Sequence, residues 1–224
     1  MMRSILIKAV ISSLLMPLVD AFSAEKLNIH FLVSDPIQLA VNQAKSQLQV
    51  KGFQTISSNL RPHITIYMTR FQKKKRADIT GYIESICKNQ KPIQITISHW
   101  KLTKDGWLFL ETKPNASVDR IHLDMINALH GFRSPYSKSP SQQLKDKFPN
   151  RIKGLMKYGS LWVHPYYEPH FSILTSKNSA GADRYIAANP WTKTVTGTLT
   201  GIAIAVANAE GQFGKVQWQC SFRG

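Results

Sequence analysis

The sequence predicts an α+β protein with a duplicated, bilobal fold, in which two antiparallel sheets face a central cleft and helices lie outside. Three observations lead to this class. Segments with the two-residue alternation of strands are interleaved with segments whose apolar residues follow helical spacing. The order strand, helix, strand, helix, hairpin, helix is followed by strand, helix, hairpin, so the second half repeats the first in outline. A short histidine pattern also occurs once in each half.

The predicted domain begins with a strand and a helix. Residues 27–33 alternate at first and then become continuously apolar, which is typical of a buried strand. A helix is expected over 35–51, because Asp35 and Pro36 are typical of a helix start and Gly52 of a helix end.

The remaining elements follow the same rules. An Asp-Gly pair at 105–106 between two alternating segments is typical of a hairpin turn. The expected strands are 62–69, 93–97, 107–111, 169–175, 195–208 and 212–222, and the expected helices are 77–88, 117–129 and one that begins at Asn178. Residues 131–160, with three prolines and many basic residues, are the least regular stretch and predict either a substrate-facing loop or an excursion of short helices.

The first 23 residues have the layout of a secretory signal peptide. Arg3 and Lys8 form a basic start, residues 9–19 are a short apolar core, and cleavage is expected after Ala21 or Ser23. This predicts a periplasmic or secreted protein, with no membrane-spanning segment after the leader.

The leader leaves residues 24–224 as one bilobal domain, which we expect to be a monomer. Its first lobe is predicted over about 53–130. Its second lobe is predicted over about 161–224, together with the strand and helix of 27–51.

The net charge of +16 favours anionic partners such as RNA or a nucleotide, although a basic surface is also typical of some soluble exported proteins. The densest basic run is 73–76. Cys87 and Cys220 are the two cysteines, and in an exported protein they are able to form one disulfide. Cysteines and histidines at the usual ligand spacings do not occur, so we expect neither a metal site nor a cofactor.

The most informative pattern is Pro-His-apolar-Ser/Thr-apolar, which begins at Pro62 and again at Pro169. With seven histidines in the chain, two chance matches to the His-apolar-Ser/Thr-apolar part would be expected about one time in a hundred. On a strand, residues two apart point to the same face, so His63 lies beside Thr65 and His170 beside Ser172.

Two such strands across a cleft would surround a phosphodiester with two imidazoles and two hydroxyls. One imidazole is able to take a proton from water while the other gives a proton to the leaving oxygen. Hydroxyls fixed on strands are suited to donating hydrogen bonds to the phosphate oxygens.

These residues resemble the defining motifs of the 2H phosphoesterase superfamily, which includes bacterial RNA 2′,3′-cyclic phosphodiesterases, also called 2′-5′ RNA ligases. The resemblance covers about 27–222, and outside the motifs it is architectural. It implies that His63 and His170 are the catalytic pair, that Thr65 and Ser172 bind phosphate, and that the reaction needs no metal. The secretory leader and the length of 131–160 depart from the usual pattern and leave the natural substrate open.

Four further residues are weaker candidates for substrate binding. Arg61 and Arg133 have the charge to pair with phosphate, and Tyr166 and Tyr167 have rings able to stack on a base. Phe171 is expected to point away from His170 and into the core.

The leading hypothesis is a metal-independent phosphodiesterase for 2′,3′-cyclic phosphate ends or small cyclic nucleotides. A 2′,5′-oligonucleotide phosphodiesterase or RNA 3′-end exonuclease of the same fold is an alternative. A non-catalytic basic module that binds RNA or another anion is an alternative of another class.

Overall fold

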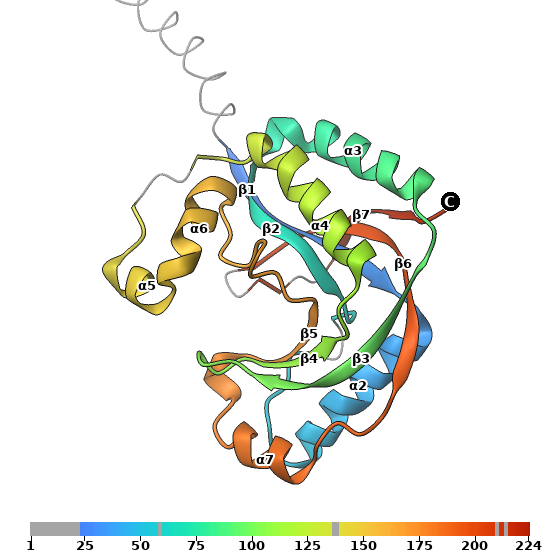
Figure 1. Ribbon diagram of the computed structural model, residues 1–224, viewed down its shortest axis with the longest axis vertical. Helices are drawn as coiled ribbons and strands as arrows, with labels where there is room; N and C mark the ends of the chain where they lie inside the picture. Colours follow the sequence, from blue (N-terminus) through green and yellow to red (C-terminus); the bar gives the residue numbers. More distant parts are fainter. Residues whose placement is uncertain (1–22, 58–59, 136–138, 209–210, 213–214) are drawn as a thin grey trace, which may run out of the picture.

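The protein is described here by a computed structural model, which defines residues 23–57, 60–135, 139–208, 211–212 and 215–224 (Figure 1). The chain forms one strongly curved sheet with helices packed against it. The predicted leader lies almost entirely outside the described residues. Within those residues, no helix combines the length and the apolar character needed to cross a bilayer.

All strand pairs in the sheet are antiparallel, and the order along it is β2-β1-β6-β3-β4-β5, with β7 also paired to β6. The strands are β1 (Ala24–Val33), β2 (Ile64–Gln72), β3 (Ile93–Leu102), β4 (Leu108–Thr112), β5 (His170–Leu174), β6 (Val195–Val206) and β7 (Val216–Ser221). The two motif strands, β2 and β5, are therefore the two ends of the sheet.

The predicted order of elements is confirmed, but the prediction of two sheets is wrong. Strand β6 is twelve residues long and pairs with β3 through its first part and with β1 through its second. This long strand joins the two halves into one sheet. Strand pairing also crosses the predicted lobe ranges, because the β3–β4 hairpin falls within the range of the first lobe and pairs with β6 and β5 of the second.

Helices cover each half of the sheet (Figure 1). Helices α3 (Arg76–Asn89) and α4 (Ala116–Leu129) pack against β7 and β2, and helices α2 (Asp35–Val50) and α7 (Ala182–Ala188) pack against β6 and β3. Because side chains alternate along a strand, one face of each motif strand points into the core between the sheet and the helices. The residues on this face, Ile64 and Ile66 of β2 and Phe171 and Ile173 of β5, are almost completely buried. The expectation that Phe171 belongs to the core is confirmed.

The stretch 131–160 forms short helices, α5 (Gln142–Lys147) and α6 (Ile152–Tyr158), with 3-10 turns around them. Helix α6 ends at Gly159, whose φ of 71° is in the left-handed region that favours glycine. The Thr69 hydroxyl donates to the Gly159 carbonyl over 3.2 Å, so the end of α6 is attached to β2. At the other side, Lys147 lies 4.0 Å from Asp105 in the β3–β4 turn.

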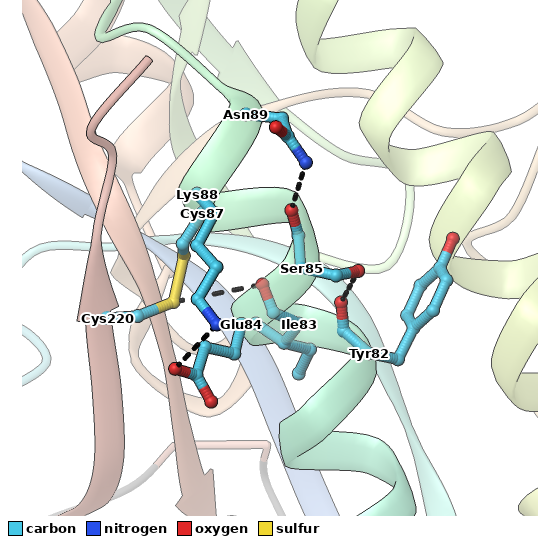
Figure 2. The surroundings of a disulfide bond; sticks show 8 residues. All are labelled: Tyr82, Ile83, Glu84, Ser85, Cys87, Lys88, Asn89 and Cys220. Carbon is cyan, nitrogen blue, oxygen red and sulfur yellow. Dashed lines mark hydrogen bonds and ion pairs between the residues drawn. A yellow bond between two sulfur atoms is a disulfide. The ribbon is translucent and has the colours of Figure 1, made fainter.

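Cys87 and Cys220 form a disulfide that links the last turn of α3 to strand β7 (Figure 2). The Cys220 sulfur also lies 3.9 Å from the carbonyl oxygen of Ile83 in the same helix. Strand β7 approaches β6 closely here, because a Cβ at Gly201 would lie 2.1 Å from the Cys220 carbonyl oxygen. The bond closes 133 positions of sequence and fixes the helix to the edge of the sheet.

Candidate active site

The curvature of the sheet brings its two end strands to one pocket. His63, directly before β2, and Thr65 lie on the strand face opposite Ile64 and Ile66, as alternation requires. His170 and Ser172 occupy the equivalent face of β5. All four predicted side chains line a single cavity of about 160 Å³.

Both motif histidines use their Nδ1 atoms in the same way. Nδ1 of His63 lies 3.1 Å from the carbonyl oxygen of Arg61, and Nδ1 of His170 lies 2.7 Å from that of Glu168. A carbonyl oxygen only accepts hydrogen bonds, so each Nδ1 carries a proton and donates it. Proton exchange with a substrate is therefore assigned to the Nε2 atom of each ring.

The charges around the two rings differ. Burial lowers the pKa of His63 to about 4; the hydrogen bond to Arg61 opposes this, and the charges of His170 and Lys45 add to it. Burial also lowers the pKa of His170, and the charge of Lys101 adds to this, whereas the hydrogen bond to the Glu168 carbonyl and the carboxylates of Glu111 and Glu168 oppose it. These carboxylates are held by Lys101, whose Nζ lies 2.8 Å from Glu111 and 2.7 Å from Glu168. The two carboxylates thus favour a proton on His170, whereas the charges of His170 and Lys45 disfavour a proton on His63.

Thr65 is oriented by a buried asparagine of the neighbouring strand. The Asn28 side-chain amide donates to the Thr65 hydroxyl oxygen over 3.1 Å and to the Gly211 carbonyl over 3.2 Å. Asn28 is completely buried. Because the hydroxyl oxygen already accepts a hydrogen bond, its own hydrogen is left to be donated to a ligand in the pocket.

Two other buried basic residues lie beside His63. The His30 ring on β1 meets the His63 ring edge-on, with ring centroids 5.1 Å apart. Lys45 on α2 is only 2% exposed, and together with His63 and Ser172 it lines a small cavity behind the main pocket. The sequence carries one signal for Lys45, since it interrupts the apolar face formed by Val41, Ala44 and Leu48.

Aromatic side chains form much of the remaining wall, and they come from distant parts of the chain. They are Tyr67, Trp107, Phe109, Trp162 and Tyr167. Phe109 stacks on the His170 ring with centroids 3.7 Å apart, which fixes the plane of the imidazole. Trp162 follows α6 and carries the Arg151 guanidinium over its ring at 4.1 Å. The wall is thus suited to a flat ligand such as a nucleobase.

The weaker candidates take different places. Tyr167 lines the pocket, where its hydroxyl donates to the Thr65 carbonyl over 3.0 Å and its ring stacks on His122 at 3.7 Å. Tyr166 lies under Arg151, with the guanidinium 5.0 Å from its ring centroid, and outside the pocket lining. Arg61 contacts His63 through its backbone carbonyl, which accepts the hydrogen bond from Nδ1 of His63.

Arg133 lies in a second cavity, of about 720 Å³, beside the main pocket. Its guanidinium donates to the carbonyls of Ser134, Met156 and Lys157, and so holds the end of α6. The residues of the pocket surroundings that were not predicted as site residues include Asn28, Lys45, Trp162 and Gln212.

Among the described residues, no group of three or more His, Cys, Asp or Glu side chains is placed to hold a metal ion.

Two histidine–hydroxyl strands that meet at one pocket of a curved antiparallel sheet define the class of two-histidine phosphoesterases. Residues 33–210 match the sequence profile of the 2′-5′ RNA ligase superfamily. The chain belongs to this superfamily, the 2H phosphoesterases, and the family resemblance predicted from the two motifs is confirmed. No curated protein matches the chain by sequence.

Solved structures of the same fold agree with this assignment. Escherichia coli LigT complexed with 3′-AMP is 10% identical, has a TM-score of 0.58, and is aligned over 90% of this chain and 100% of its own. E. coli LigT complexed with ATP is 11% identical, with a TM-score of 0.54 and coverage of 90% and 99%. TT0787 of Thermus thermophilus is 10% identical, with a TM-score of 0.56 and coverage of 89% and 98%. At these identities the likeness shows the fold.

Proposed function

We propose that the protein hydrolyses RNA-type phosphodiesters, either 2′,3′-cyclic phosphate ends or small cyclic nucleotides. The observation that carries the proposal is the convergence of His63, Thr65, His170 and Ser172 on one pocket, with both Nδ1 atoms committed to carbonyls. The E. coli LigT structures hold 3′-AMP and ATP, which supports a nucleotide ligand in this fold.

In the proposed reaction, Nε2 of His63 takes a proton from water as the water oxygen forms a bond to phosphorus. The bond from phosphorus to one ribose oxygen breaks, and Nε2 of His170 gives its proton to that oxygen. Thr65 and Ser172 donate hydrogen bonds to the non-bridging oxygens as their charge grows. We assign the base to His63 and the acid to His170, because Glu111 and Glu168 favour the proton on His170. Two imidazoles supply both proton transfers, so this scheme has no step that requires a metal.

The test is turnover of 2′,3′-cyclic nucleotides, 2′,5′-oligoadenylate and short RNAs by the mature protein in EDTA. At least one substrate should be hydrolysed, with a bell-shaped dependence on pH. His63→Ala and His170→Ala should each reduce kcat by about 10²- to 10⁴-fold while the circular dichroism spectrum is unchanged. His130→Ala, at the end of α4, is the matched control. Turnover that disappears with EDTA, or full activity in both variants, would contradict the mechanism. Binding without any turnover would favour the non-catalytic anion-binding module.

A second candidate substrate is a longer strand, as in a 2′,5′-oligonucleotide phosphodiesterase or an RNA 3′-end exonuclease. The cavity that contains Arg133 shares Met68, Ser160 and Trp162 with the main pocket and is also lined by Lys26 and Arg70. Lys26 and Arg70 are cross-strand partners, and burial together with the Arg70 charge lowers the pKa of Lys26. Like charges placed opposite each other repel, and a phosphate between them would relieve the repulsion.

The length of the substrate decides between these two candidates. If a strand extends into the second cavity, Arg70→Gln should raise KM for a tetranucleotide about tenfold and leave KM for a cyclic mononucleotide unchanged. An equal effect on both substrates would favour the short substrate.

We also propose that the protein acts outside the cytoplasm, and the disulfide between Cys87 and Cys220 supports an oxidising compartment. N-terminal sequencing of the exported protein should begin at residue 22 or 24. Exported protein that retains Met1 would contradict the prediction of a cleaved leader peptide.

A further inference from the structure

Lys45 is a buried cation that no carboxylate of the described residues neutralises. It is 2% exposed, and its one hydrogen bond is a 3.4 Å contact from Nζ to the carbonyl of Ser57. Within the described part of the chain it forms no ion pair with a carboxylate. A buried ammonium without a counter-charge destabilises a fold, so such a residue calls for a functional explanation.

The surroundings of Lys45 are basic and leave little room for water. The cavity that it lines has a volume of about 10 Å³, which is near the smallest space that holds one water. The other titratable residues around this cavity are Arg61 and His63, which add positive charge or none. Burial lowers the pKa of Lys45 to about 8, so the ammonium is still mostly protonated at neutral pH.

The small cavity and the main pocket share three wall residues, His63, Ser172 and Gln212. Lys45 therefore lies directly behind the side chains that would hold a phosphate. Attraction between its ammonium and a phosphate acts through a region of low dielectric, where charges interact more strongly than in water.

We propose that Lys45 is the third anion-binding group of this site, and that its ammonium balances the charge of the substrate phosphate held between His63 and Ser172. The inference rests on the proposed function in one respect, that a phosphoester occupies the pocket. It adds a group from outside both motifs, supplied by helix α2. Before a substrate binds, the described residues leave the Lys45 charge without a carboxylate partner, and an anionic ligand would neutralise it.

A purely structural role makes the opposite prediction about stability. If Lys45 only anchored the Ser57 carbonyl, its removal would destabilise the fold and leave anion binding unchanged. If it serves the phosphate, its removal stabilises the unliganded protein and weakens anion binding. Stability and binding then change in opposite directions, which a structural anchor does not produce.

The experiment compares the wild type with Lys45→Met, which keeps the length of the side chain and removes its charge. Lys51→Met is the matched control, since Lys51 ends the same helix and is exposed. In phosphate-free buffer, the melting temperature of Lys45→Met should rise by about 3–6 °C. Its affinity for inorganic phosphate, titrated calorimetrically at pH 7 and constant ionic strength, should fall about 10- to 100-fold. Lys51→Met should match the wild type in both.

Phosphate affinity is the deciding result. Equal affinity in Lys45→Met and Lys51→Met overturns the proposal, and so does a wild type that does not bind phosphate. Loss of affinity in Lys45→Met alone supports it, even if no phosphodiester in the substrate panel is hydrolysed and the proposed function fails. Should Lys45→Met not fold, the wild type provides the test. Its phosphate affinity should fall as pH rises through about 8, where Lys45 loses its proton. Constant affinity from pH 7.5 to 9.5 would overturn the proposal.

Discussion

The Asn28 amide donates a hydrogen bond to the Thr65 hydroxyl across two neighbouring strands, over 3.1 Å. The first predicted phosphate-binding group is therefore oriented by a residue outside either motif. Asn28 is itself held by the Gly211 carbonyl, so the arrangement connects three segments of the chain.

This relationship predicts that Asn28 and Thr65 act as a unit. Asn28→Ala should lower kcat about tenfold, because the Thr65 hydroxyl loses its orientation, and should cost about 1–3 kcal/mol of stability. In a double-mutant cycle with Thr65→Val, the effect of Asn28→Ala on kcat should nearly vanish. Additive effects in the cycle would show that Asn28 does not act through Thr65.

The carboxylates near His170 predict a shift of the pH profile. Glu111→Gln removes a charge that raises the pKa of His170, so the pKa falls. The protonated acid is then lost at lower pH, and the alkaline limb of kcat should move down by about half a unit to one unit. A profile measured with one cyclic nucleotide is sufficient. Movement of the acidic limb instead would exchange the roles assigned to His63 and His170.

Buried histidines predict loss of stability in acid. Burial lowers the pKa values of His63 and His122 to about 4, below the ordinary value of 6.5. Between these values the unfolded chain binds more protons than the folded one, so stability rises with pH and is lost as pH falls through this window.

Urea unfolding at pH 7 and pH 4.5 checks this expectation. The free energy of unfolding should fall by about 1–3 kcal/mol, and His63→Gln should remove part of that fall. His99→Gln, with the ring 59% exposed, is the control. An equal fall in His63→Gln and the wild type would show that the His63 ring is already charged in the folded protein near pH 5.

The disulfide predicts a large difference between oxidised and reduced protein. It closes 133 positions of sequence, for which chain entropy suggests about 4–5 kcal/mol. Dithiothreitol, or Cys87→Ala with Cys220→Ala, should lower the melting temperature by about 8–20 °C. It should leave kcat at 25 °C unchanged, because the bond joins α3 to β7 outside the pocket lining. The double variant should be insensitive to dithiothreitol, and a marked fall in its kcat would contradict this separation.

The position of Trp162 in the pocket wall predicts that its removal weakens the binding of a nucleobase. Trp162→Ala should raise KM for a cyclic nucleotide about 10- to 100-fold while kcat changes little, because stacking on a base contributes about 1–3 kcal/mol. Trp100→Ala is the control: the Trp100 ring packs on Trp191 away from the pocket, so its removal should leave KM unchanged. A fall in kcat with constant KM would mean that Trp162 does not hold the base.

Sequence reasoning reached the motif residues because each short strand has a local signature. His63 and Thr65, and likewise His170 and Ser172, share a face by alternation alone. The sequence did not predict the single sheet, because the pairing of β6 with both β1 and β3 depends on contacts between segments that are distant in the chain. Lys45 and Asn28 were not predicted for a related reason. Each is a polar residue within an apolar segment, and the sequence does not show which distant residue the fold places beside it. Trp162 belongs to a stretch whose short helices have little periodicity.

The position of β2 and β5 at opposite ends of one sheet has a mechanical consequence. Along the sheet, the strands β1, β6, β3 and β4 lie between the two motif strands, so their arrangement contributes to the separation of the two imidazoles. A substitution in β6 that changes the local twist would be amplified across the intervening strands. If the proposed hydrolysis holds, we therefore expect substitutions in β6, remote from the pocket, to change which sizes of substrate are accepted.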